Sequence, residues 1–162
     1  MLGNPAVTLE RERTDGELEE VKRGPTAADI ASLSDEYYLD LKGEATGDTC
    51  VYAKDFARLI EDGKAPVIAY SHVAREPEHE GFVMQYWFFW YFNQFNDLHE
   101  GDWEGMQISF EAETPAEALR SGEEPSEVIV FQHSGGERAD WDDAKVQKEG
   151  EHPVVYPAAG SH

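Results

Sequence analysis

The sequence has little cysteine and few basic residues, and each shortage excludes a class of protein. Its 162 residues include one cysteine, Cys50, which cannot form a disulfide within the chain. Lys and Arg number 13 against 34 Asp and Glu, which gives a formal net charge of −21. Because nucleic-acid binding requires a basic surface, we expect no nucleic-acid partner.

Long apolar runs are also missing. The longest covers residues 82–92, which is too short to cross a bilayer as a helix. The first ten residues show no basic region followed by an apolar stretch, so no signal peptide is visible. We therefore expect no transmembrane segment and, by default, a cytoplasmic location.

Several catalytic motifs are absent from the sequence. There is no His-Glu-x-x-His pair, no Gly-x-Ser-x-Gly turn and no glycine-rich phosphate loop. Whether the protein is an enzyme is therefore left open by its motifs.

The N-terminal part differs in character from the rest. Residues 1–25 are charged with few large apolar side chains, which predicts a loosely held arm. Thr26-Ala-Ala-Asp29 is a variant of the capping box and predicts a short helix. We therefore divide the chain into a charged N-terminal arm with a short helix, residues 1–36, and a β-sandwich domain, residues 37–162.

The remaining pattern is mainly β. Residues 82–92 are apolar on both faces, as in a central strand. Thr114 followed by Pro115 and Glu117 predicts a helix that ends at Gly122. Short strands with polar turns and brief helices predict an antiparallel β-sandwich with short helical insertions. The predicted strands are 37–41, 66–73, 82–92, 103–110, 127–133 and 153–156, and a further helix is predicted over 51–60.

The segment from His99 to Glu104 carries one imidazole and three carboxylates. Alternation along the following strand puts Asp102 and Glu104 on the same face as Met106 and Ile108. A buried unpaired carboxylate costs several kcal/mol, on the order of the stability of a small domain, and a bound cation offsets that cost. The alternative is that this end of the strand is solvated and the acids are ordinary surface groups.

A second histidine is a candidate ligand. His133 shares its parity with Ile129 and Phe131, which predicts that it points to the apolar side; the alternative is a hydrogen-bonded core histidine. Oxygen-rich ligation favours Mg²⁺ or Ca²⁺, with Mn²⁺ as a third candidate, over structural zinc. The predicted metal ligands are His99, Asp102, Glu104 and His133.

Several short motifs resemble those of a known family. The chain over residues 37–162 resembles the vacuolar protein sorting-associated protein 62 family. The motifs that carry this resemblance are Gln85-Tyr-Trp-Phe-Phe89, His99-Glu-Gly-Asp-Trp-Glu104, Phe131-Gln-His133, His152-Pro-Val-Val-Tyr156 and Ala159-Gly-Ser-His162.

A more distant resemblance is to the necrosis-inducing cytolysins, whose motif is Gly-His-Arg-His-Asp-Trp-Glu. It implies a β-sandwich whose divalent cation engages sphingolipid sugar headgroups, with His99, Asp102 and Glu104 matching the cation ligands. Gly101 replaces the second histidine of that motif. The cytolysins have one more aspartate ligand, for which this chain has no clear counterpart. The candidates to take its place are Asn93, Asn96 and Asp97.

We therefore expect a divalent-cation-binding domain that recognises a glycan or lipid headgroup at the metal site. The first alternative is a metal-dependent hydrolase, with Glu104 or His133 as base and a metal-bound water as nucleophile. The second is a structural module without a metal. Because the family resembled continues beyond the segment that ends at His162, we also expect another polypeptide to complete the sandwich.

Overall fold

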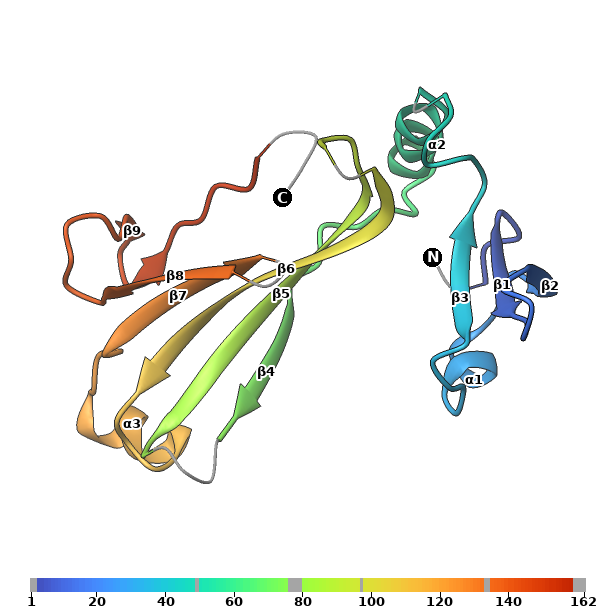
Figure 1. Ribbon diagram of the computed structural model, residues 1–162. Coiled ribbons are helices and arrows are strands. Elements are labelled where there is room, and N and C mark those ends of the chain that lie inside the picture. The colour runs from blue at the N-terminus through green and yellow to red at the C-terminus, as the bar shows by residue number, and fades with distance from the viewer. Residues whose placement is uncertain (1–2, 49, 76–79, 97, 133–134, 159–162) are drawn as a thin grey trace. The chain divides into compact units, whose positions relative to one another are not determined.

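The computed structural model describes residues 3–48, 50–75, 80–96, 98–132 and 135–158 (Figure 1). The chain divides into two compact units. Unit 1 comprises Met1–Ala65 and Asn96–Glu100, and unit 2 comprises Pro66–Phe95 and Gly101–His162. This division differs from the boundary at residue 36 that the sequence suggested. None of the helices within the described ranges is long and apolar enough to cross a membrane.

Unit 1 contains a three-stranded antiparallel sheet in the order β2-β1-β3. Its strands are β1 (Val7–Glu12), β2 (Leu18–Arg23) and β3 (Tyr37–Leu41). The prediction of a loosely held arm over residues 1–25 is therefore wrong. Val7 and Leu9 of β1 are buried, and β1 pairs with β3 from Val7 to Arg11, so this charged hairpin is part of a sheet.

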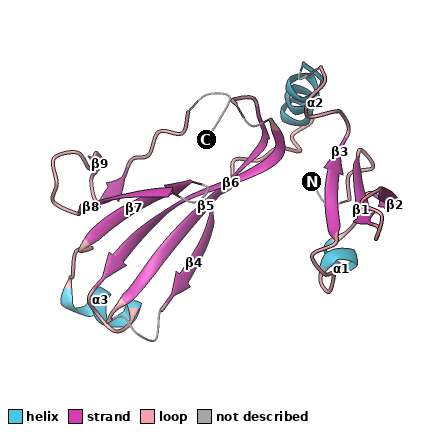
Figure 2. Ribbon diagram, in the orientation of Figure 1, coloured by secondary structure: helices cyan, strands magenta, loops and turns pink. Residues whose placement is uncertain are grey.

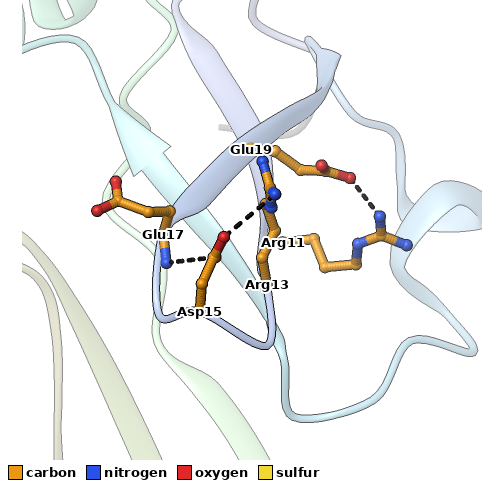
Figure 3. A network of polar contacts seen from close by, with 5 residues as sticks. All are labelled: Arg11, Arg13, Asp15, Glu17 and Glu19. Atoms are coloured by element: carbon orange, nitrogen blue, oxygen red, sulfur yellow. Dashed lines mark hydrogen bonds and ion pairs between the residues drawn. The ribbon is translucent and has the colours of Figure 1, made fainter.

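The charged residues of the hairpin pair with one another across its turn (Figure 3). Gly16 adopts a φ of 82°, and the backbone N–H of Glu17 donates to Oδ1 of Asp15 at 3.2 Å. Arg13 forms an ion pair with Asp15 at 3.1 Å, and Arg11 pairs with Glu19. Exposed pairs of this kind contribute little individually, but an Asp-Gly turn is a strong hairpin signal.

A carboxylate from the end of unit 1 joins β3 to the helix α2 (Cys50–Glu61). Glu100 accepts hydrogen bonds from the backbone N–H of Leu41, at 2.6 Å, and from the hydroxyl of Tyr52. The Tyr52 ring is buried and packs so closely on Gly43 that an added Cβ would lie 2.8 Å from it. The other helix, α1 (Ala27–Ile30), begins at the predicted capping box.

We expect Asp40→Asn to stabilise unit 1 at neutral pH. Burial and the charges of Glu100, Glu10 and Glu44 raise the pKa of Asp40 to about 6. Because this folded-state pKa lies above the ordinary value of 3.8, the stability that Asp40 contributes is full below about pH 4 and is lost as the pH rises to about 6. Urea midpoints of wild type and variant, measured from pH 4 to 7, should diverge with rising pH. The exposed Asp35→Asn is the control, and equal pH slopes for wild type and Asp40→Asn would contradict the assignment.

Unit 2 is built on a five-stranded sheet in the order β4-β5-β6-β7-β8 (Figures 1 and 2). Strand pairing is antiparallel, which confirms a mainly β fold. Within the described residues the sheets do not close into a sandwich. The strands are β4 (Tyr70–Ala74), β5 (Phe82–Asn93), β6 (His99–Phe110), β7 (Glu127–Gln132) and β8 (Gly135–Asp140), followed by the two-stranded pair β9 (Lys148–Glu149) and β10 (His152–Pro153).

Several strand limits differ from the sequence prediction. β5 lies between two other strands, as its two apolar faces predicted. β6 begins at His99, four residues before the predicted start, because polar residues there concealed the strand. β8 was not predicted, since it lacks apolar alternation and is defined by its pairing with β7. The strand predicted over 153–156 is limited to the short β10.

The helix α3 (Pro115–Ser121) confirms the predicted capping signals. The side chain of Thr114 accepts a hydrogen bond from the backbone N–H of Glu117 at 3.2 Å. Gly122 ends the helix in the left-handed conformation, with a φ of 68°. α3 lies at the end of the sheet where β6 stops and β7 begins (Figure 1).

One face of the sheet in unit 2 carries the core, and we call it the core face. Met106 and Ile108 of β6 and Val128 of β7 are buried there together with Trp141, which follows β8. Side chains from β5 and from the chain after β8 pack against them, namely Met84, Tyr86, Phe88, Val146 and Val155. The core face is therefore covered in part by the C-terminal segment of the same unit.

Candidate functional site

Asp102 and Glu104 lie on the core face of β6. Their residues are only 6% and 8% exposed, whereas Trp103 between them is 48% exposed. Met106 and Ile108 continue the same buried row. This confirms the prediction, made from strand alternation, that both carboxylates share a face with apolar residues.

Glycines on either side of the two acids allow aromatic rings to pack behind them. A Cβ at Gly101 would lie 3.2 Å from the ring of Phe89, and one at Gly105 would lie 2.4 Å from the ring of Phe131. Gly105 pairs directly with Phe131 across β6 and β7. The ring of Phe131 therefore occupies the space that a side chain at position 105 would need, and the ring of Phe89 lies close to Gly101.

Glu104 lines a cavity of about 680 Å³ in unit 2, a volume typical of small-molecule sites. Two of its walls are the rings of Phe88 and Trp90, whose centroids are 6.1 Å apart at an angle of 69°. Val155 and Tyr156, from the C-terminal segment, line another side. A small ligand in this cavity would contact aromatic surfaces and a buried carboxylate.

The electrostatic character of the cavity is acidic. Glu104 and Glu137 both line it, and its described lining residues include no lysine or arginine. Oε1 of Glu104 and Oδ2 of the neighbouring Asp102 are shielded from solvent. A cation or a cationic group is therefore the complementary ligand, since charge screening by water is weak at buried oxygens.

The structure does not bring all the predicted ligands into one described group. His99 belongs to unit 1, whereas Asp102 and Glu104 belong to unit 2. Between them, Gly101 has a φ of 64°, which interrupts the extended backbone on which strict alternation depends. Among the described residues, no three His, Cys, Asp or Glu side chains lie close enough together to hold a metal ion. The four-ligand site stays a prediction.

The residues of β7 that precede His133 lie on a different face from the predicted one. His133 itself lies outside the described residues. Ile129 and Phe131, whose parity it shares, pair with Gln107 and Gly105. Directly paired residues share a face, so Ile129 and Phe131 lie on the face opposite the core face, contrary to the prediction. The register between two strands, which sequence parity does not determine, is the reason.

The candidates for the missing aspartate ligand have different positions. Asn93 is buried, and its side-chain amide donates to the carbonyl of Phe95 while its Oδ1 accepts from the N–H of Phe95, both at 3.1 Å. That amide therefore shapes the turn after β5. Asn96 belongs to unit 1 and has a φ of 59°. Asp97 lies outside the described residues.

Sequence reasoning missed the aromatic walls of the cavity. β5 is apolar at every position around Phe88 and Trp90, so its pattern gives no sign of which rings face a cavity. Tyr156 was assigned to a strand, although in the structure it follows β10. Comparisons of this chain with protein-family models, curated protein sequences and solved structures found no match.

Proposed function

We propose that unit 2 is a divalent-cation-binding β domain that recognises a glycan or a lipid headgroup beside Glu104. The observation that carries this proposal is the burial of two carboxylates, Asp102 and Glu104, on the apolar face of one strand. Carboxylate oxygens are preferred ligands of Mg²⁺ and Ca²⁺, and Mn²⁺ accepts the same donors. His99 and His133 stay ligands predicted from the sequence alone.

The cavity supports the link between cation and ligand. Burying carboxylates is costly, and a bound cation reduces that cost. Hydroxyl and phosphate oxygens of a headgroup are themselves good ligands for hard divalent cations. A headgroup in the cavity could therefore complete the coordination shell while its apolar parts contact Phe88 and Trp90.

Metal titration tests the proposal directly. After treatment with a chelator, addition of Ca²⁺, Mg²⁺ or Mn²⁺ should raise the melting temperature of the wild-type protein by mass action. The rise should become smaller as the pH falls, because ligating carboxylates must be deprotonated. Asp102→Asn and Glu104→Gln should each abolish the rise, and calorimetric titration should show the loss of heat of binding.

The matched control is Glu124→Gln, which removes an exposed carboxylate of unit 2 away from the cavity. Its melting temperature should respond to the metal as that of the wild type does. If no divalent ion shifts the wild-type melting temperature between mildly acidic and neutral pH, the cation proposal fails. The structural module without a metal would then be the better interpretation.

A metal-dependent hydrolase is the second candidate. The concave surface beside Glu104 favours it, because a hydrolase needs room for its substrate next to its base. In that case Glu104 or His133 would take a proton from a metal-bound water. Metal-dependent turnover of ester, glycoside or phosphodiester substrates, lost in Glu104→Gln, would favour this candidate over simple recognition.

The β-sandwich is also part of the proposal. Such a fold needs a second sheet, and we propose that another polypeptide supplies the missing strands, either packed on a face of the five-stranded sheet or added at one of its edges. The edge strands are β4 and β8, and exposed edges are open to strand pairing. A monodisperse monomer that melts cooperatively would count against this part of the proposal.

A further inference from the structure

The face of the unit 2 sheet opposite the core face is rich in aromatic rings, and we call it the aromatic face. Tyr70 and Trp103 meet with ring centroids 5.3 Å apart, and Phe89 and Trp103 meet at 5.0 Å. Trp87 and Phe131 meet at 4.9 Å. Tyr70 is 51% exposed and Trp103 is 48% exposed, so much of this aromatic surface faces solvent.

Gly105 makes the second ring pair possible. Tyr70 pairs with Trp87 across β4 and β5, and Gly105 pairs with Phe131 across β6 and β7. With no side chain on β6 at this position, the rings of Trp87 and Phe131 meet above its backbone. The aromatic face therefore extends over four strands.

A row of polar side chains runs beside the rings. A ring nitrogen of His72 lies 3.3 Å from Oε1 of Gln85, and Nε2 of Gln85 donates to Oε1 of Gln107 at 3.0 Å. These residues are two positions from Tyr70, Trp87 and Gly105 on the same strands. Each glutamine amide has donor and acceptor sites beyond these hydrogen bonds. An entirely apolar partner would bury those sites without satisfying them, at a cost in free energy.

The polar row continues into a second cavity of about 550 Å³. Gln85 and Gln107 line it, as do the hydroxyl-bearing Ser109 and Ser126. Its remaining polar lining is charged and consists of Arg75, which forms an ion pair with Glu113, and of Glu80, Glu111 and Glu127. The aromatic face thus joins exposed ring surfaces to a polar cavity lined by amides, hydroxyls and carboxylates, which adds to the charge argument against an anionic ligand.

Ligand chemistry and charge together select one class of occupant. A sugar ring offers C–H groups on its faces, which pack on aromatic rings, and hydroxyls at its rim, which bond to amides. Nucleic-acid bases also stack on aromatic rings. The phosphates of nucleic acid and the carboxylates or sulfates of acidic glycans would, however, meet a chain of net charge −21.

We propose that the aromatic face binds a neutral oligosaccharide. Its sugar rings stack on Trp103 and Tyr70, and its hydroxyls bond to Gln85 and Gln107 and enter the polar cavity. This site is separate from the acidic cavity beside Glu104 and does not depend on the proposed cation. Its ligand is defined by ring stacking and neutral hydrogen bonding instead of metal coordination.

The test is binding of the full chain to an array of neutral and acidic glycans in the presence of a chelator. The strongest neutral binder is then titrated by calorimetry and by tryptophan fluorescence. Trp103→Ala and Tyr70→Ala should each weaken binding at least about tenfold, as removal of a central aromatic contact does. Trp103→Phe keeps an aromatic ring and should therefore lose less affinity than Trp103→Ala. This comparison distinguishes the loss of ring stacking from a general folding defect.

Two controls locate the site. Tyr156→Ala removes an exposed tyrosine of the other cavity and should leave saccharide affinity unchanged. The chelator is the second control: it removes the proposed cation, so failure of the cation proposal and failure of this one give different results. Binding to no neutral glycan, or equal binding to acidic ones, would overturn the proposal. A self-association that Trp103→Ala abolishes, without glycan binding, would also overturn it and assign the face to a second copy of the chain.

Discussion

Replacing Gly81 with alanine is expected to destabilise unit 2 by roughly 2–5 kcal/mol, the sum of backbone strain and overpacking. Gly81 precedes β5 and has a φ of 87°, which an L residue adopts only with strain. A Cβ at this position would lie 1.9 Å from the carbonyl oxygen of Phe110, at the end of β6. Backbone atoms cannot move aside as a flexible side chain can, so the start of β5 would have to shift.

The shift would also disturb a ring contact. Phe82 and Phe110 are stacked, with centroids 4.7 Å apart and planes within 4° of parallel. All four tryptophans, Trp87, Trp90, Trp103 and Trp141, belong to unit 2, so urea unfolding followed by their fluorescence reports on this unit.

Gly122→Ala is the matched control for Gly81→Ala. Gly122 also has a positive φ, 68°, but an added Cβ would meet nothing within 4 Å. This variant should therefore lose only about 1 kcal/mol of its free energy of unfolding, the cost of backbone strain without a steric clash. Equal losses for the two variants would show that the close approach to Phe110 has no energetic effect.

Replacing Glu100 with alanine is expected to destabilise unit 1 by roughly 3 kcal/mol, because hydrogen bonds to charged groups contribute about 1.5–3 kcal/mol each. The carboxylate accepts from the N–H of Leu41 and from the hydroxyl of Tyr52, both on buried residues. Burial and this hydrogen bond raise the pKa of Tyr52, which keeps its hydroxyl a donor. Relief of the repulsion between Glu100 and Asp40 offsets part of the loss.

Hydrogen exchange at the Leu41 amide measures this effect locally. Exchange should be much faster in Glu100→Ala than in wild type, whereas Glu100→Gln, which keeps one acceptor oxygen, should be intermediate. A double-mutant cycle with Tyr52→Phe gives the coupling between the two side chains. A coupling energy near zero would contradict the proposed link between Tyr52 and Glu100.

The sequence predicted the structure best where a local pattern of residues determines the secondary structure or the buried face. Alternation along β6 identified the buried row of Asp102, Glu104 and Met106, and capping residues identified the start of α3 at Pro115. Each of these signals spans a few residues, so no distant contact is needed to interpret it. The position of Asp102 and Glu104 on the core face was therefore predictable, whereas the cation proposed for them stays a prediction.

Elements defined by distant contacts were missed. β8 begins Gly135-Gly136 and has no apolar alternation, so only its pairing with β7 makes it a strand. Glu100 was not among the predicted site residues, because Leu41 and Tyr52, its partners, are 59 and 48 residues away in the sequence. The faces of Ile129 and Phe131 depended on the register between β6 and β7, which parity within one strand leaves open.

The discontinuity of unit 1 has a consequence for the order in which a ribosome delivers the protein. Unit 1 ends its first segment at Ala65, but Glu100 arrives only after all of β5 has been synthesised. The hydrogen bonds from Leu41 and Tyr52 to Glu100 therefore form only after β5, the most apolar strand of unit 2, has been synthesised. Domains usually fold as units during synthesis, N-terminal first. Because β5 of unit 2 precedes Glu100 of unit 1 in the sequence, the two units cannot be completed strictly one after the other.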